Sequence, residues 1–309
     1  MNSPRIIGLM TVKNEADILL EALEHAQPLH DMLLLLDCGS DDDSAEILES
    51  FAGSYENVFF LGRIGPHHAR EVRRHIWNIY RDILHHNDWW AVTDTDEFCD
   101  PRVRSVVNEA SKGLYDHIFS EHVNFYYTDS DHQAWGDIVI ENERKRSISD
   151  RRRYYRKSTS QRRLFRALPW LKWGSDDSFP EGLAGPYPGR VEYLHYQYRD
   201  PDQIEMRLAS RRSIENKDVQ SENPHWFRKD FKATVADASK LNFAENLAFG
   251  TYCSDPEMPE TIQSPLLKRL LVCIRNMVRN VFAQHRFEVP KGISQEIIDE
   301  SRTFWDSVR

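Results

Sequence analysis

The sequence predicts an α/β fold built on a parallel sheet, and two patterns in the first hundred residues carry that prediction. Short apolar runs of strand length recur, and each is followed by a segment whose apolar residues repeat at helical spacing. Strands that are apolar throughout are typical of parallel sheets with helices on both faces. The 309 residues, 40% of them hydrophobic, suffice for such a domain with a sizeable core and a smaller appendage.

Four strands with helices between them account for the first hundred residues. Ligands of such a sheet are expected at the carboxyl ends of its strands. Beyond Pro101 the alternation fades. The expected strands are residues 6–12, 32–36, 58–61 and 89–93, with one or two more within 115–127, and the expected helices are 15–26, 42–52, 72–84, 201–216 and 231–249.

The composition excludes several classes of protein. With 49 acids against 40 bases the net charge is −9, which is not that of a nucleic-acid scaffold. The longest clean apolar run, Leu33 to Leu36, is too short for a membrane span, and the N-terminus lacks the pattern of a secretory signal. The four cysteines, Cys38, Cys99, Cys253 and Cys273, show no C-x-x-C spacing, which argues against a structural zinc site or a disulfide framework. We expect a cytoplasmic protein.

The charge is unevenly distributed along the chain. Residues 144–166, here called the basic strip, contain eleven Lys or Arg against one acid, Asp150, so the strip carries +10 and the rest −19. The strip is interpreted either as a solvated face or as a contact for the phosphates of a lipid-linked acceptor or anionic bilayer. Nucleic acid is the weakest interpretation, because the acidic remainder would repel it.

A late amphipathic segment has two interpretations. From Leu266 to Phe282 the apolar residues fall on one helical face, beside a stripe formed by Lys268, Arg275 and Arg279. The segment is either a core-packing helix with a basic edge or a helix that lies on an anionic membrane surface. The second interpretation predicts a peripheral contact with the inner face of the membrane.

The most informative motif is Asp94-Thr95-Asp96-Glu97, directly after the predicted strand 89–93. Two carboxylates at i and i+2, where a strand gives way to a loop, can turn toward one hard cation that substrate phosphates complete. An EF-hand is excluded, because its sixth and twelfth positions would be Cys99 and Ser105. A D-x-D phosphatase remains a minor alternative. Dinucleotide, P-loop, zincin and α/β-hydrolase motifs do not occur in the sequence.

Four motifs occur in order along the chain. They are Met10-Thr11-Val12-Lys13-Asn14-Glu15, Leu35-Leu36-Asp37-Cys38-Gly39-Ser40-Asp41, Ala69-Arg70 at the start of a helix, and Asp94-Thr95-Asp96-Glu97-Phe98. Together they make roughly residues 5 to 100 resemble a family 2 glycosyltransferase of the GT-A fold. The D-x-D-E-F variant, with His195-Tyr196 far downstream, resembles bacterial members that act in surface-polysaccharide synthesis.

The resemblance implies a nucleotide-sugar site and a metal site. The metal, Mn²⁺ or Mg²⁺, would be held by Asp94, Asp96 and His195; the alternative for His195 is a hydrogen-bonded histidine in a tyrosine cluster. The family often has two acids where this chain has Asp37-Cys38, which leaves the choice of nucleotide base open. The residues assigned to the nucleotide sugar are Thr11, Asn14, Glu15, Asp37, Arg70 and Asp94.

Family 2 membership would imply inversion at the anomeric carbon, which requires a carboxylate to take the proton of the acceptor hydroxyl. Asp176 and Asp177 are the candidates for this base, with Glu181 and Glu121 as rivals. Trp170 and Trp173, which flank the two aspartates, could stack on a sugar ring. The alternative for each acid is an exposed loop residue.

Together these observations predict a metal-dependent, inverting glycosyltransferase that moves a sugar from a nucleotide-diphosphate donor to a glycan or lipid-linked acceptor. Its GT-A domain would cover residues 1–200, and a helical extension, associated with the membrane or acceptor, residues 201–309. The alternative from another class is a non-catalytic protein that binds anionic surfaces through the basic strip and the late helix, on a relic GT-A domain.

Overall fold

The computed structural model describes most of the chain as two compact units, each presented here by itself. The first unit comprises residues 1–121, 160–193 and 255–309, and the second comprises 122–159 and 194–254. The predicted division at residue 200 stays a prediction. The described residues are 3–65, 69–113 (with side chains from 72), 115–135, 139–168, 170–174, 179–211 and the backbone of 212, 231–245, 248–250, 252 and 289–308.

The first unit is built on a parallel sheet. Its strands β1 (Ile6–Val12), β2 (Met32–Asp37), β3 (Val58–Arg63) and β4 (Trp89–Thr93) pair in the order β3-β2-β1-β4, all parallel. Every residue of β1, β2 and β4 is buried, as expected of strands covered on both faces. This order confirms the predicted α/β class with a mostly parallel, Rossmann-like sheet.

Antiparallel strands extend this sheet beyond β4. Strand β8 (Gln161–Arg166) pairs with β4, and the first part of β6 (His117–Tyr126) pairs with β8. Strand β6 confirms the strand predicted within 115–127. The short strand β5 (Glu97–Cys99) pairs with β9 (Pro186–His195), so the chain forms a strand again soon after leaving β4.

Helices cover both faces of the parallel sheet, because odd and even residues of its strands point to opposite sides. Helices α1 (Leu19–Ala26) and α2 (Ser44–Ala52) pack on the face that carries Met10 and Leu35. On the opposite face, Leu9 and Leu34 pack with α3 (Ala69–Tyr80) and α11 (Gln295–Ser307). Helix α4 (Val103–Ser111) packs against Trp89 and Ala91.

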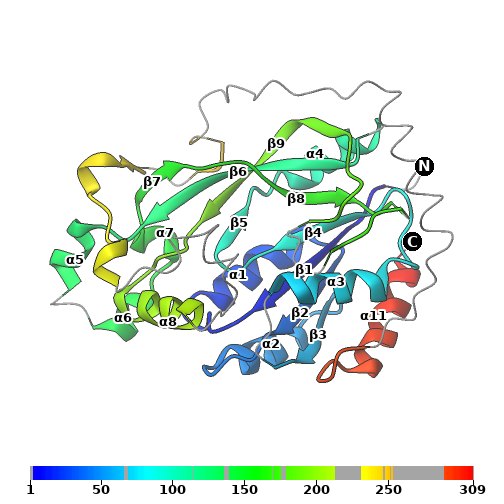
Figure 1. Cartoon of the computed structure of the whole chain (residues 1–309), viewed down its shortest axis with the longest axis horizontal. Coiled ribbons are helices and arrows are strands. Elements are labelled where there is room, and N and C mark those ends of the chain that lie inside the picture. Colours follow the sequence, from blue (N-terminus) through cyan, green and yellow to red (C-terminus); the bar gives the residue numbers. More distant parts are fainter. Residues whose placement is uncertain are drawn as a thin grey trace. The chain divides into compact units, whose positions relative to one another are not determined.

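The C-terminal segment belongs to the first unit. Helices α3 and α11, far apart in sequence, lie side by side (Figure 1), and the hydroxyls of Tyr80 and Ser301 are 2.7 Å apart. The backbone N–H of Ser294 donates to Leu61 of β3 at 2.8 Å. Gly62 and Gly292 have positive φ, and a Cβ on either would collide with the carbonyl opposite it, so this close approach requires glycine at both positions.

The second unit contains a small antiparallel sheet and short helices. The last part of β6 pairs with β7 (Tyr154–Lys157), which pairs with β10 (Asn242–Phe243). The predicted helix from residue 201 is confirmed over its described part, whereas a helix over 231–249 is wrong, because the chain there forms two single turns and pairs with β7. The helices are α5 (Asp129–Trp135), α6 (Ile140–Arg144), α7 (Ile148–Arg151), α8 (Pro201–Arg212), η3 (Phe231–Thr234) and η4 (Ala238–Lys240).

Two structural expectations can be placed only in part. The segment Leu266–Phe282 lies outside the described residues, so both of its interpretations stay open. Within the described part of the chain, none of the helices has the length and apolar character needed to span a bilayer.

Cys38 and Cys99 are buried free thiols, and burial raises the pKa of each to about 12, which keeps them protonated.

Candidate functional site

The acid-rich motif lies at the point where the strand order of the parallel sheet reverses. The chain runs outward from β1 through β2 to β3 and then returns to β4 on the other side of β1, where Met10 is opposite Thr93. Asp94 follows β4 directly, and Lys13 follows β1. In open parallel sheets, ligands bind outside the carboxyl ends of the strands at such a reversal. We call this end of the first unit's sheet the carboxyl edge.

The loops after β1 and β2 are joined by side chains that bond backbone groups. Asn14 has a left-handed backbone, with φ of 55°, a conformation that asparagine tolerates better than most residues. Its N–H donates to Ser40 Oγ at 2.9 Å, and its Oδ1 accepts from the N–H of Asp41 at 2.7 Å. The N–H of Glu15 donates to Ser44 Oγ at 3.0 Å. Asn14 and Glu15 therefore have a structural role in shaping this edge, and their predicted donor contacts stay predictions.

Asp37 ends β2 with a fully buried carboxylate that its own loop surrounds. The carboxylate accepts from the N–H groups of Gly39 and Ser40 at 3.2 Å and from Ser40 Oγ at 2.5 Å. Arg63, the last residue of β3, approaches it at 3.1 Å with a half-exposed side chain. These bonds fix Asp37 before any ligand arrives, so its predicted contact with a nucleotide stays a prediction.

Two arginines hold the carboxylate of Asp94, one on each oxygen. Arg73 of α3 places Nη2 2.5 Å from Oδ1, and Arg163 of β8 places Nη2 2.9 Å from Oδ2. Both arginine side chains are 7% exposed, whereas that of Asp94 is 26% exposed. Sequence reasoning missed both arginines. The helical spacing of Val72 and Ile76 indicates a buried helix face, but it does not single out Arg73 as a site residue. Arg163 was counted only as one cation of the basic strip.

The rest of the motif is buried. Asp96 and Glu97 are 4% and 5% exposed, and Glu97 also accepts a hydrogen bond from Arg163. Burial works against the charged form of Arg163, but the carboxylates of Glu97 and Asp94 outweigh it and raise the pKa of Arg163 above its ordinary value. Arg163 therefore stays a cation at the carboxyl edge at any physiological pH.

His195 lies in the second unit beside a second histidine that sequence reasoning missed. Its ring centroid is 5.7 Å from that of His122, and the two residues offer metal-ligating atoms within 4.8 Å of each other. His195 Nδ1 is 2.9 Å from Asn124 Oδ1, an acceptor, so Nδ1 donates and the bond orients the ring. Such an orienting hydrogen bond is typical of metal-ligating histidines. His122 and Asn124 are two residues apart on strand β6 and share one of its faces. The sequence alone does not show that β9 brings His195 next to them.

Several other predicted residues are placed only in part. Thr11 is buried on β1, and among the described residues its hydroxyl has no hydrogen-bond partner. Arg70 lies in α3, with a side chain outside the described set, and Asp176 and Asp177 lie outside it altogether. All of these assignments stay predictions.

The rivals and neighbours of those aspartates are described. Glu181 is exposed, and its N–H donates to the carbonyl of Lys172 at 2.7 Å. Glu121 is half-buried in β6. Trp173 is 3% exposed and packs edge-on against Phe165 in the core, so the expectation that it stacks on a sugar is wrong; its large apolar ring is more stable buried.

Part of the basic strip is turned inward. Four of its eleven cations are buried, namely Arg151, Arg152, Arg163 and Arg166. Arg166 donates to the carbonyls of Gly113 and Ala110 at the end of α4, where a helix attracts cations. These charges are part of the protein interior, so the strip is not one solvated face.

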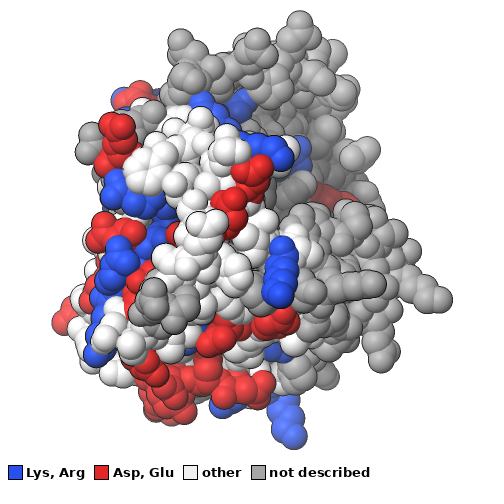
Figure 2. All heavy atoms as spheres, turned by 90° about the vertical axis from the view of Figure 1, so that its left-hand side faces the viewer, with Lys and Arg blue, Asp and Glu red and all other residues white. Residues whose placement is uncertain are grey.

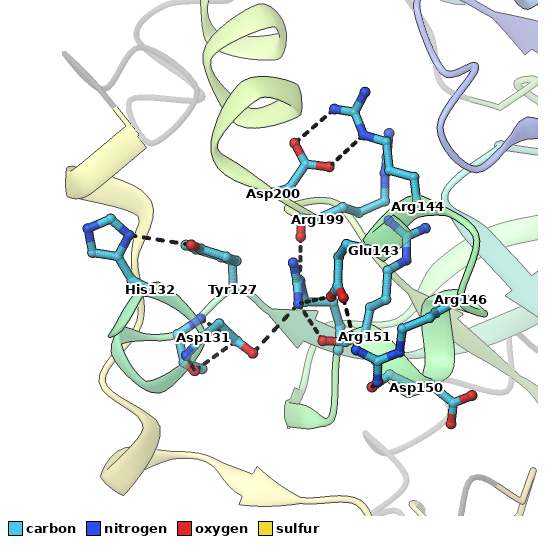
Figure 3. Close-up of polar contacts among 12 residues, drawn as sticks. Tyr127, Asp131, His132, Glu143, Arg144, Arg146, Asp150, Arg151, Arg199 and Asp200 are labelled. Atoms are coloured by element: carbon cyan, nitrogen blue, oxygen red, sulfur yellow. Dashed lines mark hydrogen bonds and ion pairs between the residues drawn. The ribbon is translucent and has the colours of Figure 1, made fainter. Parts of the chain in front are cut away.

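In the second unit, the strip's arginines pair with nearby acids (Figure 3). Arg144 and Asp200 are 2.9 Å apart, as are Arg146 and Glu143. Arg152 lies over the ring of Tyr127, 4.9 Å from its centroid. Over the face in Figure 2, Lys and Arg side chains are interspersed with Asp and Glu. Arg144 and Arg146 are thus compensated by acids, so these two cations offer little to an anionic surface.

Comparisons with known proteins add little to this picture. No family model matches the chain, and no curated protein matches its sequence. One solved structure that matches in part is the mannosyltransferase PcManGT from Pyrobaculum calidifontis in complex with GDP-Man and Mn²⁺. The match has a TM-score of 0.29 and 13% identity, and it covers 44% of this chain and 39% of the length of that neighbour. A likeness of this size carries no argument, so the function is argued from the chain's own residues.

Proposed function

We propose that the protein is a metal-dependent, inverting glycosyltransferase that moves a sugar from a nucleotide-diphosphate donor to a hydroxyl of a glycan or lipid-linked acceptor. The observation that supports this proposal most strongly is the position of Asp94, Asp96 and Glu97 at the strand reversal, together with the guanidinium groups of Arg73 and Arg163. Carboxylates can hold a divalent cation, and guanidinium groups suit phosphate oxygens. A nucleotide diphosphate with its cation needs both.

The donor would bind along the carboxyl edge. Thr11, Asn14, Glu15 and Asp37 belong to the loops after β1 and β2, and Arg70 opens α3, whose N-terminus suits a diphosphate. The buried hydroxyl of Thr11, without a partner among the described residues, is a donor and acceptor that a ligand could use. Arg73 and Arg163 would add positive charge where the departing nucleoside diphosphate gains negative charge.

The residues of the chain fit a divalent cation. The proposed ligands are Asp94, Asp96 and His195. Carboxylate oxygen together with imidazole nitrogen suits Mn²⁺ better than Mg²⁺, which prefers oxygen alone. When bound, the cation would neutralise charge on the leaving diphosphate. Asp176 or Asp177 is the proposed base that accepts the proton of the acceptor hydroxyl.

Thermal unfolding with and without Mn²⁺ tests donor binding. UDP, GDP, ADP, CDP and their sugar conjugates would be screened, and we expect one nucleotide to raise the melting temperature only when Mn²⁺ is present. The nucleotide sugar so found would then be assayed for hydrolysis and transfer. Failure of every nucleotide diphosphate to stabilise the protein would favour the non-catalytic alternative.

Substitutions test the metal ligands. We expect Asp96→Ala, alone or with Asp94→Ala, to lower donor hydrolysis at least about a hundredfold, because an uncompensated diphosphate is a poor leaving group. The matched control is Asp82→Ala, which removes an exposed carboxylate that pairs with Arg302 at 2.8 Å. Undiminished activity in Asp94→Ala/Asp96→Ala would contradict the metal role.

A further inference from the structure

The geometry around Asp94 points to a second role for its two arginines, one that rests on the proposed function. We propose that Arg73 and Arg163 are built-in counter-cations: they offset two of the three negative charges of the Asp94–Glu97 segment while the site holds no ligand. A divalent cation then binds tightly only together with a diphosphate, which takes over the guanidinium groups. The site would thereby respond to the complex of cation and nucleotide and not to the cation alone.

The contacts of Asp94 support the first half of this inference. Arg73 and Arg163 come from α3 and β8 and bond different oxygens of the same carboxylate, at 2.5 and 2.9 Å. A cation that approached either oxygen would meet a guanidinium group already bonded there. In this arrangement, a metal ion bound to Asp94 would lie beside a buried guanidinium group, which repels it unless the arginine moves away.

The charge of the cluster leads to the same conclusion. The segment carries three carboxylates, Asp94, Asp96 and Glu97, and the two arginines bonded to it leave a formal charge of −1. Both guanidinium groups are almost fully buried, so solvent screens them weakly and their repulsion of a divalent cation is strong. A diphosphate brings further negative charge, and its oxygens can bond the guanidinium groups that repel the cation.

The arginines are also able to bind the phosphate oxygens of a diphosphate, which the second half of the inference requires. A guanidinium group has five N–H donors in a planar fork that matches phosphate oxygens. The Nε–H of Arg163 is buried, and among the described residues it has no hydrogen-bond partner. The side chain of Asp94 is 26% exposed, more than those of Arg73 and Arg163, so a ligand would approach from the side of Asp94.

The consequence is a positive coupling between cation and nucleotide. If a diphosphate draws the guanidinium groups away from Asp94, it exposes the carboxylate to the cation, and by linkage the cation strengthens nucleotide binding by the same factor. Removal of one arginine charge should break this coupling in a characteristic way. The cation alone should bind more tightly, and the nucleotide more weakly.

Mn²⁺ binding to the full chain, followed by loss of the free-ion electron paramagnetic resonance signal, tests the inference. The nucleotide that stabilises the wild-type protein is added in half of the titrations, and nucleotide without protein serves as the blank. We expect it to tighten Mn²⁺ binding to the wild type at least about thirtyfold. In Arg73→Gln, Mn²⁺ alone should bind at least about tenfold more tightly than to the wild type, and the coupling should fall below about threefold.

Two further variants separate charge from folding. Arg73→Lys keeps the positive charge, so Mn²⁺ alone should bind it as weakly as it binds the wild type. Arg302→Gln removes an arginine of α11 that pairs with Asp82, and it should leave every titration unchanged. Circular dichroism and the melting temperature show whether each variant is folded.

The outcomes distinguish this inference from the proposed function. Tight binding of Mn²⁺ to the wild type without nucleotide, or unchanged Mn²⁺ affinity in folded Arg73→Gln, would overturn the counter-cation role and leave the proposed function intact. Absence of Mn²⁺ binding by every variant, with and without nucleotide, would overturn both. Tighter Mn²⁺ binding in Arg73→Gln that Arg73→Lys does not reproduce would support the inference.

Discussion

The two edges of the first unit's parallel sheet use charged residues in different ways. At the amino edge, where the strands begin, ion pairs join segments far apart in the chain. Arg5 bonds Asp88 at 2.9 Å, donates to the carbonyl of Trp305 at 2.7 Å, and lies 3.8 Å from the centroid of the Trp305 ring. At the carboxyl edge, Arg73 and Arg163 converge on one carboxylate, that of Asp94, which is partly open to solvent.

The difference lies in what the charges bond. At the amino edge the acids also bind backbone groups: Asp31 accepts from the N–H of Ile6 at 2.7 Å, and Asp88 from that of His85 at 2.9 Å. A backbone group cannot leave without local unfolding, whereas a side-chain guanidinium can turn to another anion. The amino edge therefore stabilises the fold, and the carboxyl edge is suited to exchange partners with a ligand.

The largest effect on stability is expected at the amino edge. Asp88→Ala leaves the mostly buried guanidinium of Arg5 without its carboxylate, which should lower the free energy of unfolding by about 3 to 4 kcal/mol. Urea denaturation measures the change. Nucleotide and Mn²⁺ binding to the folded variant should equal those of the wild type; weakened binding would contradict the division between the edges.

The second effect is a pH dependence at the amino edge. Burial, opposed by a hydrogen bond to the Ala26 carbonyl, lowers the pKa of His30 to about 4 from its ordinary 6.5. The unfolded chain therefore takes up a proton between these values, so this contribution is complete above pH 6.5 and is lost as the pH falls toward 4. The expected loss is up to about 3 kcal/mol.

Stability curves of the wild type and His30→Gln between pH 4 and 7 measure this contribution. The glutamine amide can still donate to the Ala26 carbonyl but does not titrate. Its curve should be flatter across this range. Parallel curves for the two proteins would show that His30 titrates normally.

A third prediction concerns Asp37, which lies at the carboxyl edge but is held like the acids of the amino edge. Asp37→Ala removes a buried acceptor of three hydrogen bonds from Gly39 and Ser40, at an expected cost of about 2 kcal/mol. Thermal and urea unfolding measure the loss. A variant as stable as the wild type would show that this carboxylate is not a fixed part of the loop.

The smallest effect is expected for the ion pair of Asp82 and Arg302. The pair is 2.8 Å apart, but the Asp82 side chain is 66% exposed, and water screens such pairs. Asp82→Ala should change the free energy of unfolding by less than about 0.5 kcal/mol. A larger loss would mean that this exposed pair stabilises the first unit more than its solvation allows.

Local patterns in the sequence were sufficient to predict the parallel sheet and the helices that cover it. The four parallel strands, the helices between them and the place of Asp94-Thr95-Asp96-Glu97 after the fourth strand all follow from apolar periodicity and motif position. Periodicity failed over 231–249, where two single turns replace a helix, the second of them capped by Asp237, and Asn242 and Phe243 then pair with β7.

The sequence by itself determined which faces are buried and at which edge the acids lie, because burial pattern and strand direction are local properties of the chain. Only the tertiary structure decided which charges meet. Arg73 and Arg163 reach Asp94 from α3 and β8, ninety residues apart, and Trp173 enters the core beside Phe165. Whether a cation is paired, buried or exposed depends on how distant elements pack, and a count of charges along the chain does not contain that information.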